Sequence, residues 1–448
     1  MGKIELDGKK AFAALPQGVS KAEIEAERKE TVSVSISGEA MGLNASSVTT
    51  LYARVGGEVS GTACSQALGQ DLSQLLEKAR DNGRWAGGRA LPFAKPLQKT
   101  FSDGRRPQNP EALRELAAAL EKAVRAVSQG IVSASAAVSE ESTSIRLLSA
   151  DGADLQSENR AIVAEITAEA DWDGFACGSE LTLTGGSPED FCPEKMAAAL
   201  AEQLRLQQRP GSFTPGSYRV LLDQPVVWNL MLTAWQVFSG PRCAAKTSCF
   251  HQMLGKQVGS SCLGVADYPS HPQTGFRYDF DFEGSPCQPV ALVKQGRMAG
   301  MLHHLDSAAA FGALSNGRAG RAPLLTSGIP NAYTVTPRIF IVEPGQAKAE
   351  MLPELLGDGL RITESYDPFH CLDIASGHFS IPCRGILYKN GKPAGSVASI
   401  AIHGELSELF QAIELVGDDL RIAPFLMTHA YCVGAPSLLV SRLVVSGK

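Results

Sequence analysis

The stretch that decides the fold lies at residues 217–240 and reads SYRVLLDQPVVWNLMLTAWQVFSG. Its first part, residues 218–222, is short, apolar and partly β-branched, which predicts a buried strand. Asp223 and Pro225 then favour the start of a helix, because Asp caps free N–H groups and Pro suits the first turn. We expect this helix to run through Phe238 and to end at the Ser-Gly-Pro of residues 239–241.

This predicted helix is apolar on nearly all sides. Trp228, Leu232 and Trp235 form one stripe, while Val227 and Met231 cover other faces. A helix without a polar face is buried rather than laid on a surface. We therefore expect it to be the central element of its domain.

The composition is that of an ordinary globular protein of 448 residues, with 44% hydrophobic and 20% charged residues. The net charge of −6 offers no field that attracts phosphate backbones, so no nucleic-acid partner is expected. No apolar run is long enough to span a membrane, and the first ten residues are too polar for a secretory signal. Ten cysteines without a CxxC pair fit reduced thiols and a cytoplasmic location.

The first part of the chain mixes helices with hairpins. The predicted helices are 21–30, 71–82, 109–130 and 193–208. The predicted strands are 32–36, 48–55, 131–139, 142–149 and 161–170, with a turn at Gly56-Gly57 and a loop over 89–109. Helices and hairpins that do not alternate one to one favour an α+β fold over a doubly wound sheet.

The Pro- and Gly-rich stretch 209–216 predicts a domain boundary. We therefore divide the chain into an N-terminal α+β layered domain, 1–210, and a β-rich, largely antiparallel C-terminal domain, 211–448. Strands are predicted there at 289–294, 339–342, 385–389, 397–403 and 438–445. Asn390-Gly391 predicts a hairpin turn, and residues 405–416 read as one late helix.

Seven short segments carry a resemblance to a known family. They are GKQVGS at 255–260, DFEG at 281–284, SNGRAGR at 315–321, EPG at 343–345, SGHFS at 376–380, NG at 390–391 and GAPSL at 434–438. Their order and spacing, with the opening strand and helix, resemble the second domain of the TldD/PmbA family, often labelled modulators of DNA gyrase. The resemblance covers residues 217–447, and the N-terminal part agrees mainly in layout.

The resemblance implies that the opening helix is a degenerate metal site. One branch of the family, TldD, is a zinc metallopeptidase subunit with a His-Glu-x-x-x-His helix here, whereas the PmbA/TldE branch is its partner and lacks that motif. Met231, Leu232 and Gln236 stand where the first His, the Glu and the second His would be. These side chains neither bind zinc well nor act as a general base. The family's third ligand, a Cys near 417–421, is also missing.

Some other positions depart from the family pattern. Phe282, Arg338, His378 and Glu405 stand where smaller polar residues are expected. In the family, the turn that resembles SGHFS faces the cleft. We therefore expect His378, Phe379, Arg338 and Glu405 to be the residues that contact a bound peptide in the cleft.

A local cluster of zinc-type ligands offers an alternative site. His370, Cys371, His378 and Cys383 lie within 14 residues of one another, yet no CxxC or HxxxH pair fixes two of them on one turn. The simpler interpretation is that they are ordinary substitutions at loop positions. We predict no metal ion and no catalytic residue in this chain.

The resemblance therefore implies a non-catalytic PmbA/TldE-like subunit of a TldD-type zinc metallopeptidase. Its partner chain would bring the zinc and the general base, and the pair would act on small or unstructured peptides in peptide maturation or degradation. We expect a homodimer when this chain is alone and a heterodimer with the TldD-like chain. The alternative is a homodimeric peptide- or protein-binding module without protease activity.

Overall fold

The computed structural model describes residues 4–67, 69–86, 91–102, 104–172, 174–207, 211–321, 333–367, 369–425 and 431–447. In the first part the helices are α1 (Lys9–Ala13), α2 (Leu72–Ala86), α3 (Pro110–Ala126), η1 (Pro188–Asp190) and α4 (Pro193–Leu206). The strands are β1 (Val19–Ser37), β2 (Ala40–Gly57), β3 (Gly61–Ser65), β4 (Gln98–Ser102), β5 (Ile131–Ser149), β6 (Asp154–Trp172) and β7 (Phe175–Gly185).

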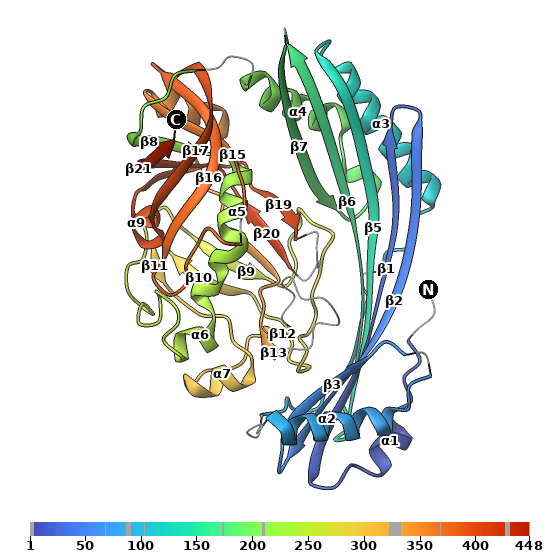
Figure 1. Cartoon of the computed structure of the whole chain (residues 1–448). Helices are drawn as coiled ribbons and strands as arrows, with labels where there is room; N and C mark the ends of the chain where they lie inside the picture. The colour runs from blue at the N-terminus through green and yellow to red at the C-terminus, as the bar shows by residue number, and fades with distance from the viewer. Residues whose placement is uncertain are drawn as a thin grey trace.

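These strands form one long, curved sheet in the order β3-β2-β1-β5-β6-β4, with β7 paired to β6 (Figure 1). Helix α3 covers the upper part of one face, where Val34 packs against Leu113 and Val124. Helix α2 covers the lower part of the same face, where Ile24 packs against Leu76. The other face of the sheet is turned toward the second half of the chain.

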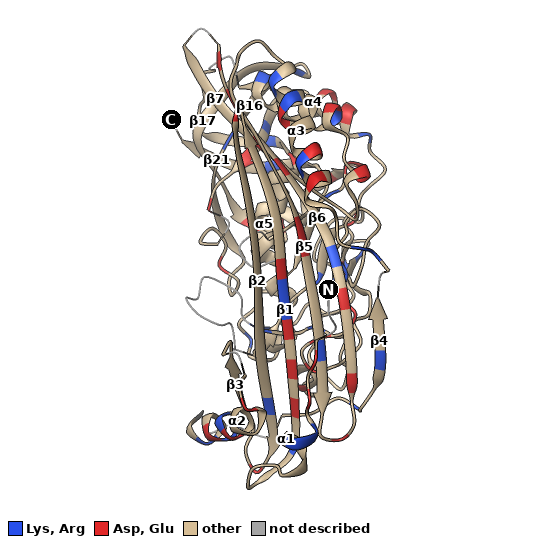
Figure 2. Cartoon of the chain, turned by 90° about the vertical axis from the view of Figure 1, so that its right-hand side faces the viewer, with Lys and Arg blue, Asp and Glu red and all other residues tan. Residues whose placement is uncertain are grey.

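Residues 21–30 belong to strand β1, so the helix predicted there is wrong. β2 and β5 pair with both edges of this segment. Ala22, Ile24 and Ala26 pack on one face, and the glutamates between them face the other. Pairing on both edges therefore overrides the helical preference of a run rich in Glu, Lys and Ala. Figure 2 shows several acidic and basic residues along β1, whereas Arg54 is the one charged residue of β2.

Three further predictions for this half need correction. The turn of the β1–β2 hairpin lies at Gly38, which has a φ of 59°, whereas Gly56-Gly57 are the last residues of β2, just before the short turn into β3. The segment predicted as a loop contains β4, which pairs in parallel with β6. The two strands predicted between 131 and 149 are one continuous strand, and β7 was not predicted. Local turn residues set these boundaries less strongly than pairing along the sheet does.

In the second half the helices are α5 (Gln224–Ala234), η2 (Trp235–Phe238), α6 (Gly240–Ala244), α7 (Leu305–Ala310), η3 (Ala349–Met351), α8 (Leu352–Leu356) and α9 (Leu406–Gln411). The strands up to residue 342 are β8 (Gly216–Leu222), β9 (Val265–Tyr268), β10 (Val290–Lys294), β11 (Arg297–Met298), β12 (Ala319–Arg321), β13 (Tyr333–Val335) and β14 (Ile339–Val342). The later strands are β15 (Gly359–Ser365), β16 (His378–Lys389), β17 (Lys392–Glu405), β18 (Ile413–Val416), β19 (Arg421–Pro424), β20 (Cys432–Ala435) and β21 (Leu438–Gly447).

Two six-stranded sheets enclose the main core of this half. Their orders are β11-β10-β9-β14-β20-β19 and β17-β16-β15-β8-β21-β18, and β12 and β13 form a separate pair. Helix α5 lies between the sheets, and Val227, Met231 and Phe238 are almost fully buried in this core. The expectation of a central, buried helix is confirmed. Most pairs in both sheets are antiparallel.

Two helix predictions in this half need correction. The helix that begins after Asp223 is α-helical only to Ala234 and continues as the 3-10 helix η2 to Phe238. The late helix ends at Gln411, because residues 413–416 form β18 and pair with β21. The end of the late helix is set by pairing with β21, which is distant in the sequence, and no local pattern reveals this pairing.

The α+β fold class is confirmed by these layers of helices on antiparallel-rich sheets. The first sheet is built from residues before 186 and the two larger later sheets from residues after 215. The exact division at 210/211 stays a prediction. No helix in the described ranges is long and apolar enough to cross a membrane.

Candidate functional site

Helix α5 and the 3-10 helix η2 that continues it carry the three positions at which the resemblance places metal ligands and a base. Met231 and Leu232 are each only 1% exposed. Gln236 lies on η2 and accepts a hydrogen bond from Arg242, 2.8 Å away. A thioether, an aliphatic side chain and a neutral amide do not make a zinc site, so this helix does not fit the metal.

Strand β19 lies beside α5, so the segment in which the resemblance places the third ligand is next to this helix. The indole N–H of Trp228 donates to the carbonyl oxygen of Ala423 at 3.3 Å. The side-chain amide of Gln224 donates to the carbonyl oxygen of Asp419. The two halves of the expected site therefore meet, but with side chains of different chemistry.

A cavity of about 260 Å³ opens where α5 and β19 face the first sheet. We call it the α5 pocket. Its lining residues come from β7, α4, α5, β15, β19 and the segments next to them: Ser179, Glu180, Thr182, Gln203, Pro225, Trp228, Asn229, Leu232, Thr363, Glu364, Ser365, Phe369, Arg421, Ala423, Pro424 and Phe425. The volume lies just below the range of about 300–1,000 Å³ typical of sites for drug-sized ligands.

One wall of the α5 pocket is apolar and aromatic. Trp228 and Leu232 come from the helix, and the rings of Phe369 and Phe425 pack with their centroids 5.4 Å apart. Apolar walls with a few directed polar groups are typical of small-ligand sites. The pocket can therefore hold an apolar group beside α5.

The polar groups of the α5 pocket lie on the strands. Glu364 pairs with Arg384, and the side-chain amide of Asn229 donates to the carbonyl oxygen of Ser365 at 2.7 Å. Arg421 is half-buried, and burial lowers its pKa to about 10 even though carboxylates nearby oppose the change. At neutral pH its guanidinium therefore still carries its charge.

The residues expected to contact a peptide do not come together in this pocket. His378 and Glu405 form an ion pair at 3.2 Å, with side chains 65% and 41% exposed, where β16 pairs with β17. Phe379 is buried in the main core. Arg338 is buried, and its guanidinium donates to the carbonyl oxygens of Gly317 and Ala319.

The four candidate zinc ligands are also engaged separately. His370 pairs with Asp367 at 2.6 Å, and the thiol of Cys371 contacts the Asp367 carbonyl oxygen at 2.7 Å. Cys383 is buried, and burial raises the pKa of its thiol to about 12. Within the part of the chain that the structure describes, no three His, Cys, Asp or Glu side chains are placed to hold a metal ion together.

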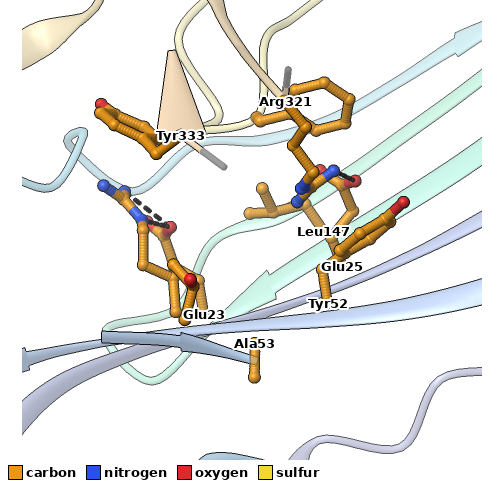
Figure 3. Close-up of a pocket in the computed structure, with 10 residues that line it drawn as sticks. Glu23, Glu25, Tyr52, Ala53, Leu147, Arg321 and Tyr333 are labelled. Atoms are coloured by element: carbon orange, nitrogen blue, oxygen red, sulfur yellow. Dashed lines mark hydrogen bonds and ion pairs between the residues drawn. The ribbon is translucent and has the colours of Figure 1, made fainter. Parts of the chain in front are cut away.

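A second, smaller cavity of about 30 Å³ lies lower in the molecule, where the first sheet meets the loops of the second half (Figure 3). Arg54 pairs with Glu23 at 2.7 Å, and Arg321 pairs with Glu25 at 2.8 Å. The Arg321 guanidinium also stacks between the rings of Tyr52 and Phe282. With a volume of about 30 Å³, this cavity is too small to hold a peptide.

The segments DFEG and SNGRAGR each contribute a residue to the lining of this cavity, Phe282 and Arg321. Asp281 accepts hydrogen bonds from the N–H groups of Glu283, Ser285 and Ala319 at 2.9 Å each. Burial raises the pKa of Glu283 to about 8, although Arg54 opposes this. These segments therefore join the two halves of the chain.

The sequence did not reveal the residues that make the α5 pocket. Glu180, Thr363 and Arg421 come from three distant strands, and Glu180 lies on a strand that the sequence analysis missed. The one available signal was that Arg421 falls in the 417–421 segment where the resemblance places a missing ligand. Its charge alone did not indicate a role.

Comparison with known proteins places this geometry in context. A family model described as the PmbA/TldA metallopeptidase C-terminal domain matches residues 215–447. Two curated relatives are similar: Metalloprotease TldD homolog of Buchnera aphidicola subsp. Acyrthosiphon pisum, 24% identical over 212 residues, and Metalloprotease PmbA of Escherichia coli O157:H7, 25% identical over 229 residues. These matches cover 45% and 51% of this chain but only 42% and 47% of the relatives, less than half their length.

Solved structures share the fold over nearly the whole chain. TldE from Thermococcus kodakarensis superposes with a TM-score of 0.82 at 17% identity, covering 96% of this chain and 98% of that one. A candidate modulator of a DNA gyrase from Thermotoga maritima gives 0.81 at 22% identity, covering 95% and 96%. At these identities the likeness establishes the fold alone.

Proposed function

Because the chain belongs to the PmbA/TldD metallopeptidase family, we propose that it is the subunit without a metal centre in a TldD-type peptidase. A TldD-like partner would supply the zinc and the general base. This chain would complete the chamber and help to position the substrate. The substrates would be small or unstructured peptides that the pair matures or degrades.

The observation that carries this proposal is the donor set on α5. Met231 and Leu232 are buried and Gln236 is bonded to Arg242, so the side chains at the ligand positions serve packing and local structure. The helix is nevertheless in place and lies against β19. A preserved scaffold with replaced ligands is what a partner subunit needs, since the chemistry is done by the other chain.

The α5 pocket and the strands around it support a role with peptides. Among the described strands, β19 is at the end of its sheet and β7 is paired with β6 on one side. Both strands line the pocket. An extended peptide can add to such an edge through main-chain hydrogen bonds while its side chains enter a pocket.

Co-expression with a TldD-like zinc chain tests the proposal. The two chains should purify together as a stable pair, with size measured by light scattering. A lasting pair needs a contact of at least about 1,200 Å² in total, because smaller contacts are mostly weak or transient. Recovery of two separate species at micromolar concentration would contradict the proposal.

A second candidate function is a homodimeric module that binds peptides or proteins without serving a protease. The α5 pocket favours this alternative, because a cavity with an apolar wall lies beside the helix on which metal ligands were sought. A homodimer that persists unchanged in the presence of the zinc chain would support this alternative.

A further inference from the structure

Arg421 is the positively charged side chain of the α5 pocket that a bound anion could pair with. It lines the cavity, and its guanidinium makes no hydrogen bond or ion pair with another residue in the described part of the chain. It and Ala423 line the pocket, whereas Ile422 between them packs on the opposite side against Ala161 and Val163. The alternation of the strand therefore presents the guanidinium to the pocket.

The carboxylates around Arg421 do not satisfy it. Asp223 pairs with Arg361 at 2.9 Å, and Asp419 accepts from the hydroxyl of Ser437 at 2.7 Å. Glu180 is exposed at the rim of the pocket and forms no ion pair with Arg421. An arginine in such a site offers a planar pair of donors that suits a carboxylate.

A second buried group in the same pocket also lacks a partner. Thr363 is only 8% exposed, lines the cavity, and its hydroxyl has no hydrogen-bond partner among the described residues. Leaving a buried hydroxyl unpaired is unfavourable, so such a group points to a missing ligand atom. It is independent of Arg421, since the two residues lie on different strands in different sheets.

We propose that the α5 pocket binds the carboxylate end of a short apolar peptide, with Arg421 as the anion-binding group. The carboxylate lies against Arg421 and the hydroxyl of Thr363. The last side chain of the peptide packs against Trp228 and Leu232. Glu180 at the rim suits the ammonium group of a very short peptide.

This inference deepens the proposed function, on which it rests, by naming what part of a peptide this subunit holds. A pocket that holds free carboxylate ends would bind the products of cleavage or the end of a substrate. The distinguishing feature is the free carboxylate, because an amidated end offers Arg421 no negative charge.

Calorimetric titration of this chain alone tests the inference. The probes are the dipeptide Ala-Phe and its C-terminal amide. Ala-Phe should bind saturably, and the amide at least about tenfold more weakly, because the charge-assisted contact is lost. Arg421→Met should weaken Ala-Phe by a similar factor and leave the amide nearly unchanged. Thr363→Val should weaken Ala-Phe to a smaller extent.

Arg242→Met is the matched control, because Arg242 bonds to Gln236 on the neighbouring η2 and does not line the pocket. Equal affinity for both probes, or no saturable binding up to about 10 mM, would overturn the inference. The comparison of the two probes on the unaltered chain decides the question even if Arg421→Met fails to fold. The titration uses this chain alone, so a negative result would overturn the carboxylate site without bearing on the peptidase proposal, which co-expression tests.

Discussion

The indole N–H of Trp228 on α5 donates to the carbonyl oxygen of Ala423 on β19, with 3.3 Å between the two atoms. This contact joins the helix that carries the replaced ligand positions to the strand that carries Arg421. Apolar packing and a free guanidinium therefore stand where the family resemblance places a metal site.

The core role of η2 predicts a large effect of Trp235→Ala. Trp235 is 5% exposed and packs edge-on against Tyr431 at 6.0 Å between ring centroids. Removing it should lower the free energy of unfolding by about 3–5 kcal/mol. Trp228→Ala should cost less, because Trp228 is only half-buried and lines a cavity.

Chemical denaturation measures both changes. Trp85→Ala is the control, since Trp85 is 91% exposed and its removal should change stability by no more than about 0.5 kcal/mol. A loss for Trp235→Ala no larger than for Trp85→Ala would show that η2 is not in the core.

The buried ion pair of Arg318 and Asp267 should be expensive to break on one side only. Both side chains are 0% exposed, and Arg318 also donates to the carbonyl oxygen of Gln288 at 2.6 Å. Arg318→Met leaves Asp267 as an uncompensated buried charge, so we expect a loss of about 3–5 kcal/mol. The double variant with Asp267→Asn should recover part of it.

Arg205→Met provides the contrast, because the Arg205–Glu202 pair is exposed and should contribute at most about 1 kcal/mol. Urea denaturation of the unaltered chain, Arg318→Met, Asp267→Asn and the double variant completes the cycle, and Arg205→Met is measured beside them. Equal losses for Arg318→Met and Arg205→Met would contradict the structural role of the buried pair.

Glu25 should make stability depend on pH. Burial raises its pKa from 4.5 to about 7, although Arg321 opposes the change. The folded chain therefore binds more protons than the unfolded chain between about pH 4.5 and pH 7. Its contribution is complete below this window, and the free energy of unfolding falls as the pH rises through it.

Glu25→Gln should remove about 1–3 kcal/mol of that fall. Denaturation curves at pH 5 and pH 7.5 measure it. Glu202→Gln, at an exposed position, should leave the pH dependence unchanged. An identical slope in Glu25→Gln and the unaltered chain would mean that Glu25 does not titrate in this way.

His378 gives a prediction about substrate handling in the complex with the zinc chain. It is exposed and pairs with Glu405 at 3.2 Å. His378→Ala should change the turnover or affinity of a peptide without removing zinc from the partner. His370→Ala is the matched control, because the side chain of His370 is 74% exposed and pairs with Asp367 rather than Glu405. Equal kinetics for both variants would remove His378 from the peptide path.

The sequence revealed the elements whose signals are local. The strand before Asp223, the start of α5 after it and the start of α3 at Pro110 all follow from apolar runs and capping residues. The helix predicted for residues 21–30 was wrong because this segment is held as a strand by β2 and β5, and by Arg54 and Arg321, which pair with Glu23 and Glu25. A helix-like composition carries no information about those partners.

The candidate site was only half visible in the sequence. The assignment of Met231, Leu232 and Gln236 to ligand positions rests on resemblance, because these positions lie in one continuous motif, and it stays a prediction. The α5 pocket could not be predicted, since Arg421, Thr363 and Glu180 lie on strands of three different sheets and come together only when these sheets pack. Burial and the absence of a partner are properties of the folded chain alone.

The central claim is most directly tested by peptidase activity and zinc content measured on three samples: this chain, a TldD-like zinc chain, and the two co-expressed. We expect no stoichiometric zinc in this chain alone, because α5 lacks ligands, and about one zinc per pair in the complex. Cleavage of an unstructured peptide should appear only in the complex and vanish when the Glu of the partner's zinc helix is changed to Gln. One tightly held zinc in this chain alone, or full activity of the partner alone, would contradict the claim.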